Sequence, residues 1–126
     1  MDFKNEFGCG ETLLRGIHIK PDFWDEEENR PSSAAFMDKK GVSVNRTGDN
    51  KRCYEKSLEC LKNNIGERLR AVAELDVDFC VELGVYLKYC PEKDNIYHSE
   101  IHRSKSEILL TKSVARKLSK ACKIVD

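Results

Sequence analysis

The stretch LLRGIHIKPDFWDEEENRPSSAAFMDKKGVSVNR, residues 13–46, holds most of the chemically versatile side chains of this 126-residue chain. It opens as a strand, because residues 12–18 follow the two-residue period of extended backbone. Arg15 then interrupts an apolar row, and His18 points to the opposite face. A buried arginine is costly unless acceptors satisfy its donors, so Arg15 is a candidate ligand-binding residue; the alternative is an edge strand whose guanidinium lies in water.

An acidic segment follows at residues 22–28, where five carboxylates surround Phe23 and Trp24. The carboxylates repel one another and belong in solvent, while the two aromatic rings can anchor the segment to the rest of the protein. The segment lacks the staggered oxygen ligands and the glycine of a calcium-binding loop, so we predict no metal site here.

The sequence R-P-S-S at residues 30–33 places two hydroxyl groups directly after a proline. Such an exposed corner can hold a phosphate, or it can cap a helix or a turn, which is the commoner use of serine. We therefore take Arg30, Ser32 and Ser33 as candidate ligand-binding residues and leave both uses of the corner open.

Three sequence elements resemble a group of small, uncharacterised bacterial proteins: L-R-G-I-H at residues 14–18, R-P-S-S-A-A-F at residues 30–36 and G-V-S-V at residues 41–44. The group shares an R-P-S-S-x-A-F element before an L-S-V or V-S-V strand. Residues 95–98 and the lysine-rich final helix resemble the same group, so the likeness covers residues 13–124. The resemblance implies a bacterial, cytosolic, single-domain protein and no particular activity.

Length and composition indicate one domain over residues 1–126, with residues 1–11 as a loosely ordered N-terminal segment. The chain is 40% apolar and 35% charged, with a mean hydropathy of -0.59, which is typical of a water-soluble globular protein. No apolar stretch is long enough for a membrane span, and the N-terminus lacks the apolar segment of a signal peptide. We therefore expect a cytoplasmic protein without a membrane partner.

The six cysteines contain no C-x-x-C pair and lie mostly within apolar patterns. We expect them to be reduced and buried, as in cytosolic proteins. Structural zinc needs paired ligands two to four residues apart, so we predict no metal and no cofactor. No sequence feature indicates a lowered thiol pKa, and we predict no catalytic residue among Cys9, Cys53, Cys60, Cys80, Cys90 and Cys122.

Hydrophobic periodicity predicts an α+β fold with a mainly antiparallel sheet packed by two amphipathic helices. The segment at residues 30–36 is expected to pair with residues 41–44 across a turn at residues 38–41, and residues 85–89 are expected to form a hairpin with residues 97–103. The strands of the sheet are expected at residues 12–18, 42–46, 69–75, 85–89 and 97–103.

The first amphipathic helix is expected at residues 51–64, with Gly66 as its stop. The second is expected to begin at Thr111, a good N-cap. Its buried stripe is predicted to contain Val114, Ala115, Leu118, Ala121 and Cys122. A short helix is also predicted between residues 76 and 84.

His98, Glu100 and His102 would share one face of the strand at residues 97–103. Two imidazoles and a carboxylate form a recognised metal set, but alternate residues on a strand lie nearly 7 Å apart, which separates the two histidines by about 13 Å. We therefore predict a solvent-facing polar stripe without a metal and keep Glu100 as a candidate ligand-binding residue.

The formal net charge is zero, but the charge is unevenly distributed. Residues 22–28 carry five acids, whereas residues 103–123 carry seven bases against Glu107 alone. Arg116 and Lys120 on the final helix are therefore candidate contacts for an anion, and the alternative is a solubilising surface. A chain without a net positive charge does not demand nucleic acid as its partner.

Three functions agree with these features. The first is a binding or accessory module that holds an anionic ligand or partner, such as a nucleotide, a nucleic acid or an acidic protein surface. The second is an enzyme, because the order of Arg15, Ser33 and Glu100 resembles the Arg-Ser-Glu order of ADP-ribosyltransferases, in which these residues position the dinucleotide, support the pocket and stabilise the sugar cation. The third is an oligomeric assembly subunit that pairs acidic with basic surfaces.

Overall fold

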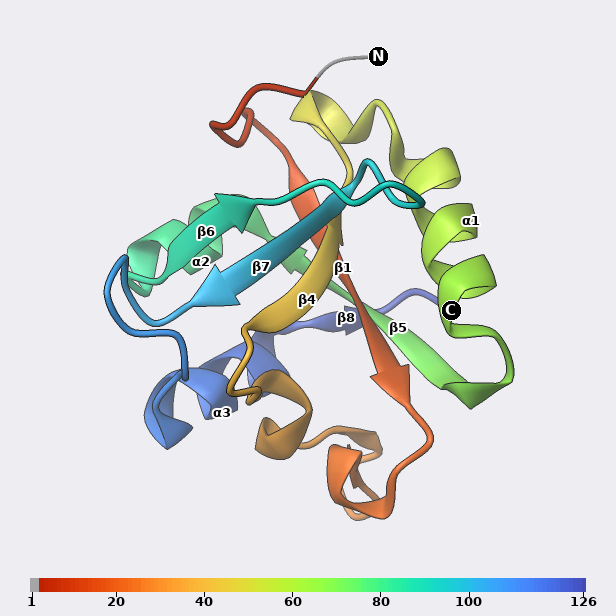
Figure 1. Ribbon diagram of the computed structural model, residues 1–126. Coiled ribbons are helices and arrows are strands. Elements are labelled where there is room, and N and C mark those ends of the chain that lie inside the picture. Colours follow the sequence, from red (N-terminus) through yellow and green to blue (C-terminus); the bar gives the residue numbers. More distant parts are fainter. Residues whose placement is uncertain (1–2) are drawn as a thin grey trace.

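Strand β1 (Thr12–His18) lies at the centre of the fold and pairs with β4 (Val42–Arg46) on one side and β5 (Leu69–Asp76) on the other. In the computed structural model, which describes residues 3–126, six strands form one sheet in the order β6-β7-β4-β1-β5-β8 (Figure 1). All their pairings are antiparallel. The remaining strands of this sheet are β6 (Tyr86–Tyr89), β7 (His98–His102) and β8 (Lys123–Ile124).

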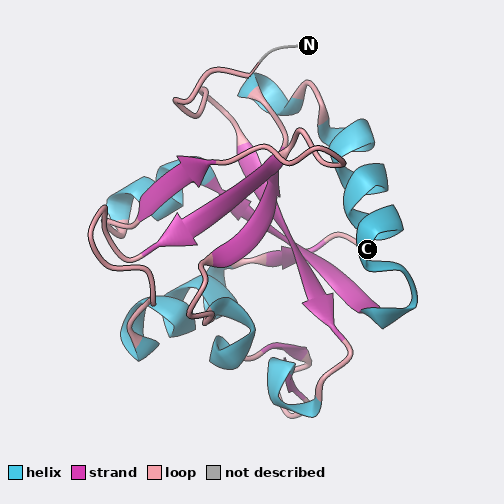
Figure 2. Ribbon diagram, in the orientation of Figure 1, coloured by secondary structure: helices cyan, strands magenta, loops and turns pink. Residues whose placement is uncertain are grey.

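The helices cover the sheet from both sides (Figure 2). Helix α1 (Tyr54–Ile65) packs on one face, where Leu61 meets Leu14 and Val72. Helices α2 (Val77–Glu82) and α3 (Lys112–Ala121) contribute to the larger apolar cluster on the opposite face. Short 3-10 helices lie at Pro21–Phe23, Ser33–Phe36, Asp49–Lys51 and Gly66–Arg68, and a two-stranded sheet joins β2 (Trp24–Asp25) to β3 (Arg30–Pro31).

Local chemistry explains where the two long helices begin and end. The Thr111 side chain accepts a hydrogen bond from the backbone N–H of Val114 at 3.2 Å, which satisfies one donor of the first turn of α3. Helix α1 stops at Gly66, whose φ of 64° is a conformation that glycine adopts without a steric penalty. Both ends are as the sequence predicts.

Alternation along β1 divides the sheet into two chemically different faces. Leu13 and Ile17 are fully buried in the cluster with α3, and we call this side the α3 face. Leu14 is buried against α1, and we call that side the α1 face. The α+β class, the mainly antiparallel sheet and the five predicted strands are therefore confirmed.

Two predictions about the first third of the chain are wrong. Ser33–Phe36 is a 3-10 helix rather than a strand, and β4 pairs with β1 and β7 instead. The carbonyl of Ala35, within this helix, accepts a hydrogen bond from Nε of Arg15 at 3.1 Å. The alternative that Arg15 lies on an edge strand with its head in water is also wrong, because β1 has a neighbour on each side.

The predicted burial of the cysteines and of the α3 stripe needs correction. All six cysteines are free, but only Cys53 and Cys80 are buried, and Cys9 is exposed. Ala121, placed in the buried stripe of α3, is exposed because the helix ends there and the chain turns into β8. Strand β8 was too short to be recognised by periodicity.

Residues 3–11 are fastened to the sheet by a buried ion pair between Glu11 and Arg46. Nε and Nη2 of Arg46 donate to the two carboxylate oxygens of Glu11 at 2.8 and 2.9 Å. The same guanidinium donates to the carbonyls of Lys4 and Glu6 and lies over the ring of Phe3 at 4.5 Å.

Within residues 3–126, no helix has the length and apolar character needed to cross a membrane.

Candidate functional sites on the two faces of the sheet

Helix α3 carries a row of cations on its outer surface. Lys112, Arg116 and Lys120 follow one another at intervals of four residues, so they lie along one side of the helix, with Lys117 beside them. All four are exposed, and none forms an ion pair with another residue of the described chain, 3–126. Like charges at this spacing destabilise a helix by about 0.2–0.5 kcal/mol per pair, so an anion bound along the row would relieve a repulsion already present.

The serine corner lies next to this helix, because α3 packs against the 3-10 helix Ser33–Phe36. The hydroxyl of Ser32 donates to the carbonyl of Asp22, and the backbone N–H of Ser32 donates to the carbonyl of Phe23 at 3.0 Å. Ser32 therefore ties the corner to the preceding acidic segment, although it also occupies the N-cap position of the 3-10 helix. The Ser32 side chain makes no capping hydrogen bond to this helix, and Ser33 is half-buried beside it.

Arg15 lies beneath the serine corner and connects it to the sheet by two hydrogen bonds. Its Nε donates to the carbonyl of Ala35 at 3.1 Å and its Nη1 donates to the carbonyl of Ser43 at 3.0 Å. Only 7% of the residue is exposed, and no carboxylate of residues 3–126 lies within ion-pair distance of it. Burial lowers the pKa of Arg15 to about 10, partly offset by the charge of Asp38, so the guanidinium is still protonated at neutral pH.

The α1 face contains a polar cleft of about 230 Å³. It forms where the end of α1 rests on β1: a Cβ added at Gly16 would lie 2.2 Å from Cδ1 of Ile65, so only glycine allows this approach without a shift. Helix α1 also contacts β4, where Nδ2 of Asn45 donates to the carbonyl of Ser57 at 3.1 Å, and polar residues of β4 and β7 line the cleft beside the helix. The lining includes His18, Ser43, Asn64, Glu92 and His98.

All three histidines of the chain lie on this face. Partial burial, together with the charge of Arg15, lowers the pKa of His18, so its imidazole is neutral near pH 7. Nε2 of His98 lies 3.4 Å from the hydroxyl of Ser43 on the adjacent strand. Nε2 of His102 lies 2.8 Å from Oε1 of Glu100.

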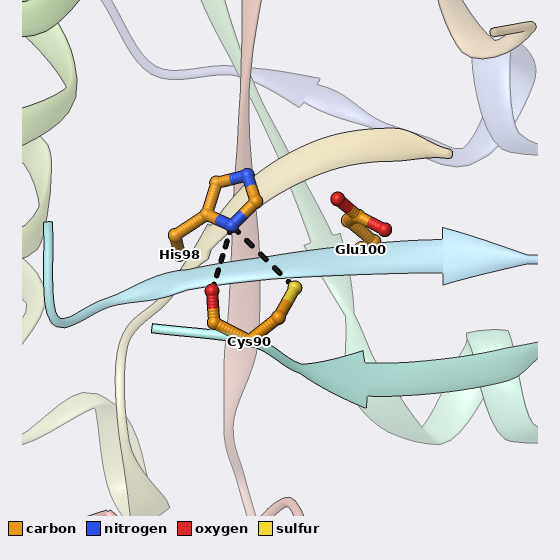
Figure 3. A group of neighbouring side chains, drawn as sticks. All are labelled: Cys90, His98 and Glu100. Atoms are coloured by element: carbon orange, nitrogen blue, oxygen red, sulfur yellow. Dashed lines mark hydrogen bonds between the residues drawn. The ribbon is translucent and has the colours of Figure 1, made fainter. Parts of the chain in front are cut away.

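Cys90, His98 and Glu100 come together at the end of the β6–β7 hairpin (Figure 3). One ligand atom of each residue lies within 4.8 Å of those of the other two. Nδ1 of His98 lies 2.9 Å from the carbonyl oxygen of Cys90 and 3.5 Å from its Sγ. Burial raises the pKa of the Cys90 thiol to about 11, and the Glu100 carboxylate contributes, so the thiol is protonated at neutral pH.

Glu100 and His102 form a partly buried pair under the turn that precedes β4. A Cβ added at Gly41 would lie 2.8 Å from both Oε1 of Glu100 and Nε2 of His102, and Gly41 has a φ of 104°. His102 is only 7% exposed and Glu100 is half-buried. The predicted shared face of His98, Glu100 and His102 is right, but the stripe is not a solvent-facing one, because the Gly41 turn covers its far end.

The structure separates the predicted site residues into three groups. Ser32 and Ser33 lie beside α3, which carries Arg116 and Lys120, and Arg30 is close enough for its charge to act on Cys122 at the end of that helix. Arg15 lies beneath them in the core. Glu100 lies on the α1 face, so Arg15, Ser33 and Glu100 do not line a common cavity.

Two contacts are not predicted from the sequence: Cys90 beside His98, and the Glu11–Arg46 pair. The sequence predicts the hairpin, but the position of Cys90 depends on the register of its two strands. Because Tyr89 pairs with Ser99, Cys90 lies beside His98. For Glu11 and Arg46, 35 residues apart, no local signal exists. No protein-family model, curated protein or solved structure matches the chain.

Proposed function

We propose that the protein is a small binding or accessory module that holds an anionic ligand or partner on its α3 face. The observation that carries this proposal is the row of Lys112, Arg116 and Lys120, which has no ion-pair partner within the described chain. Four exposed cations on three turns of helix create a local positive potential that a net charge of zero does not reveal.

The chain's own acidic segment does not neutralise the row. Asp25 accepts hydrogen bonds from the backbone N–H groups of Glu27 and Glu28, and Glu26 pairs with Arg70 at 3.4 Å. No ion pair within residues 3–126 joins the segment at residues 22–28 to α3. The cations of α3 therefore stay available to an external anion.

Arg15 supports the site from below in this proposal. At 7% exposure it is too buried to meet a partner surface, but it holds the carbonyls of Ala35 and Ser43 at fixed positions. It thereby positions the serine corner beside α3. We also propose a cytoplasmic location, which is supported by the six free cysteines.

The test is a panel of anions measured at increasing salt: pyrophosphate, nucleoside triphosphates, single-stranded and duplex oligonucleotides, and an acidic peptide. We expect at least one to bind with an affinity that falls as salt rises, because screening weakens contacts between exposed charges. The double variant Arg116→Gln/Lys120→Gln should weaken binding about tenfold, the equivalent of two exposed charge contacts of up to 1 kcal/mol each.

The matched control is Lys56→Gln/Lys93→Gln, which removes two exposed cations at places remote from α3. It should leave the affinity unchanged. Equal losses in both double variants, or no salt-sensitive binding by the wild type, would overturn the proposal. A molar mass from light scattering that falls with salt, without anion binding, would instead assign the two charged surfaces to assembly between copies.

A further inference from the structure

We propose that Cys90, His98 and Glu100 bind one transition-metal ion of the zinc class. The β6–β7 hairpin creates this set from residues that are eight and two positions apart in the chain. The backbone N–H of Cys90 donates to the carbonyl of His98 at 3.2 Å, which extends the ladder by one pair and places the two side chains next to each other. Glu100 follows His98 on the same side of β7.

The spacing of the ligand atoms suits a tetrahedral ion. Zinc lies about 2.3 Å from thiolate sulfur and about 2.0–2.2 Å from imidazole nitrogen or carboxylate oxygen, so two ligands of one ion are roughly 3.3–3.8 Å apart. Sγ of Cys90 and Nδ1 of His98 already lie 3.5 Å apart, and no pair of ligand atoms in the set exceeds 4.8 Å. The longest separation exceeds the spacing for one ion by at most about 1 Å, so the side chains must move by up to that amount to bind it together.

The charges of the set also favour a dication. A thiolate at Cys90 beside the Glu100 carboxylate would place two negative charges together, and a 2+ ion balances them. Burial and Glu100 raise the pKa of Cys90 to about 11, so zinc binding at neutral pH must displace the thiol proton. The combination of sulfur, nitrogen and oxygen selects zinc or cobalt over magnesium and calcium, which prefer oxygen alone.

When Nδ1 of His98 binds an ion, the ring proton can lie on Nε2, where it has a hydrogen-bond acceptor. In the metal-free chain Nδ1 lies 2.9 Å from the carbonyl oxygen of Cys90, so the proton belongs there. On binding, the proton moves to Nε2, where the hydroxyl of Ser43 at 3.4 Å is the acceptor. Cys90, His98 and Glu100 are all partly exposed, so water can reach the ion as a fourth ligand.

The test is titration of the reduced, full-length protein with cobalt, followed by displacement with zinc. We expect one equivalent of cobalt to produce a thiolate-to-cobalt charge-transfer band and the intense visible bands of a four-coordinate ion. Zinc should abolish both bands. Binding should release a proton from the thiol, so the apparent affinity for zinc should rise with pH.

Substitutions of Cys90, His98 and Glu100 test whether the ion binds to these three residues. Cys90→Ser and His98→Gln should each weaken zinc binding by more than about 100-fold, because loss of a ligand costs at least as much as loss of an outer hydrogen bond. Glu100→Gln, which has the same shape as the wild type, should weaken binding without affecting the fold. The controls are Cys60→Ser and His18→Gln, which alter another half-buried cysteine and another cleft histidine and should leave the affinity unchanged.

Absence of a charge-transfer band in the wild-type protein would overturn the proposal, whatever the variants do. So would a band that survives Cys90→Ser or disappears equally in Cys60→Ser, because the ion would then lie at another thiol. The result is independent of anion binding at α3, since the two sites lie on opposite faces of the sheet and share no residue.

Discussion

Arg15 and Arg46 are both buried on the α3 face of the sheet, yet their surroundings differ. Arg46 is 2% exposed and meets the carboxylate of Glu11 through two hydrogen bonds, with the rings of Phe3, Phe7 and Tyr89 within 5 Å of its guanidinium carbon. Arg15 is 7% exposed, and within residues 3–126 its hydrogen-bond acceptors are the backbone carbonyls of Ala35 and Ser43.

The difference shows two ways of keeping a cation inside a small protein. Arg46 follows the usual rule that a buried charge has a counter-charge, and the aromatic rings add cation–π attraction. Arg15 relies on two backbone dipoles, so the chain retains a buried charge whose desolvation is only partly offset. These two hydrogen bonds join the 3-10 helix Ser33–Phe36 to β4 through the guanidinium of Arg15.

The largest expected loss of stability comes from Glu11→Gln, which leaves Arg46 as a buried cation without the Glu11 carboxylate as its counter-charge. We expect a loss of about 3–5 kcal/mol in the free energy of unfolding, measured by urea denaturation. The control Glu107→Gln removes the carboxylate from the exposed pair with Arg103 and should leave the midpoint unchanged. A loss for Glu11→Gln no larger than for the control would show that the aromatic rings alone suffice for Arg46.

A smaller effect is expected from Arg15→Gln, which keeps a donor but removes the charge. We expect a loss of about 1–2 kcal/mol, because one of the two carbonyl acceptors is left unsatisfied while the buried charge is relieved. The half-buried Arg30 is the control, and Arg30→Gln should have little effect. A loss as large as that of Glu11→Gln would mean that Arg15 has a stronger electrostatic partner than its two carbonyls.

The smallest expected effect on stability is the contribution of Arg15 to the pH dependence of the free energy of unfolding. Its pKa in the folded protein is about 10, below the ordinary value of 12.5, so between these values the unfolded chain binds more protons and stability rises with pH. The gain from this group is on the order of 1 kcal/mol on going from neutral pH to pH 10.5. It should appear as the difference between the urea stabilities of wild type and Arg15→Gln at the two pH values, and an equal change in both proteins would contradict it.

Sequence patterns predict the strands and helices of this protein well and its long-range polar contacts poorly. The alternation of residues 12–18 places Arg15 on a buried face, and Thr111 marks the start of α3, because strand period and helix capping are local properties. The 3-10 helix Ser33–Phe36 was mistaken for a strand because its apolar residues face the core without a long periodic pattern.

The missed contacts depend on how distant segments meet. Glu11 is an ordinary acidic residue until β1 and β4 pair, because only then does it reach Arg46. The spacing of His98 and His102 along β7 says nothing about Cys90, which follows the adjacent strand β6. Predicting that cluster requires the register of the hairpin, which a single sequence does not determine.

The fastening of residues 3–11 has a practical consequence for handling the protein. A protease cut between Lys4 and Glu11 would release the carbonyls and the Phe3 ring that shield Arg46, and it would uncover neighbouring aromatic surface at the same time. The Glu11–Arg46 pair would remain, but the trimmed chain would expose apolar aromatic surface around it and would tend to self-associate during purification. An affinity tag that must be cleaved off is therefore best removed by a protease that does not recognise this segment.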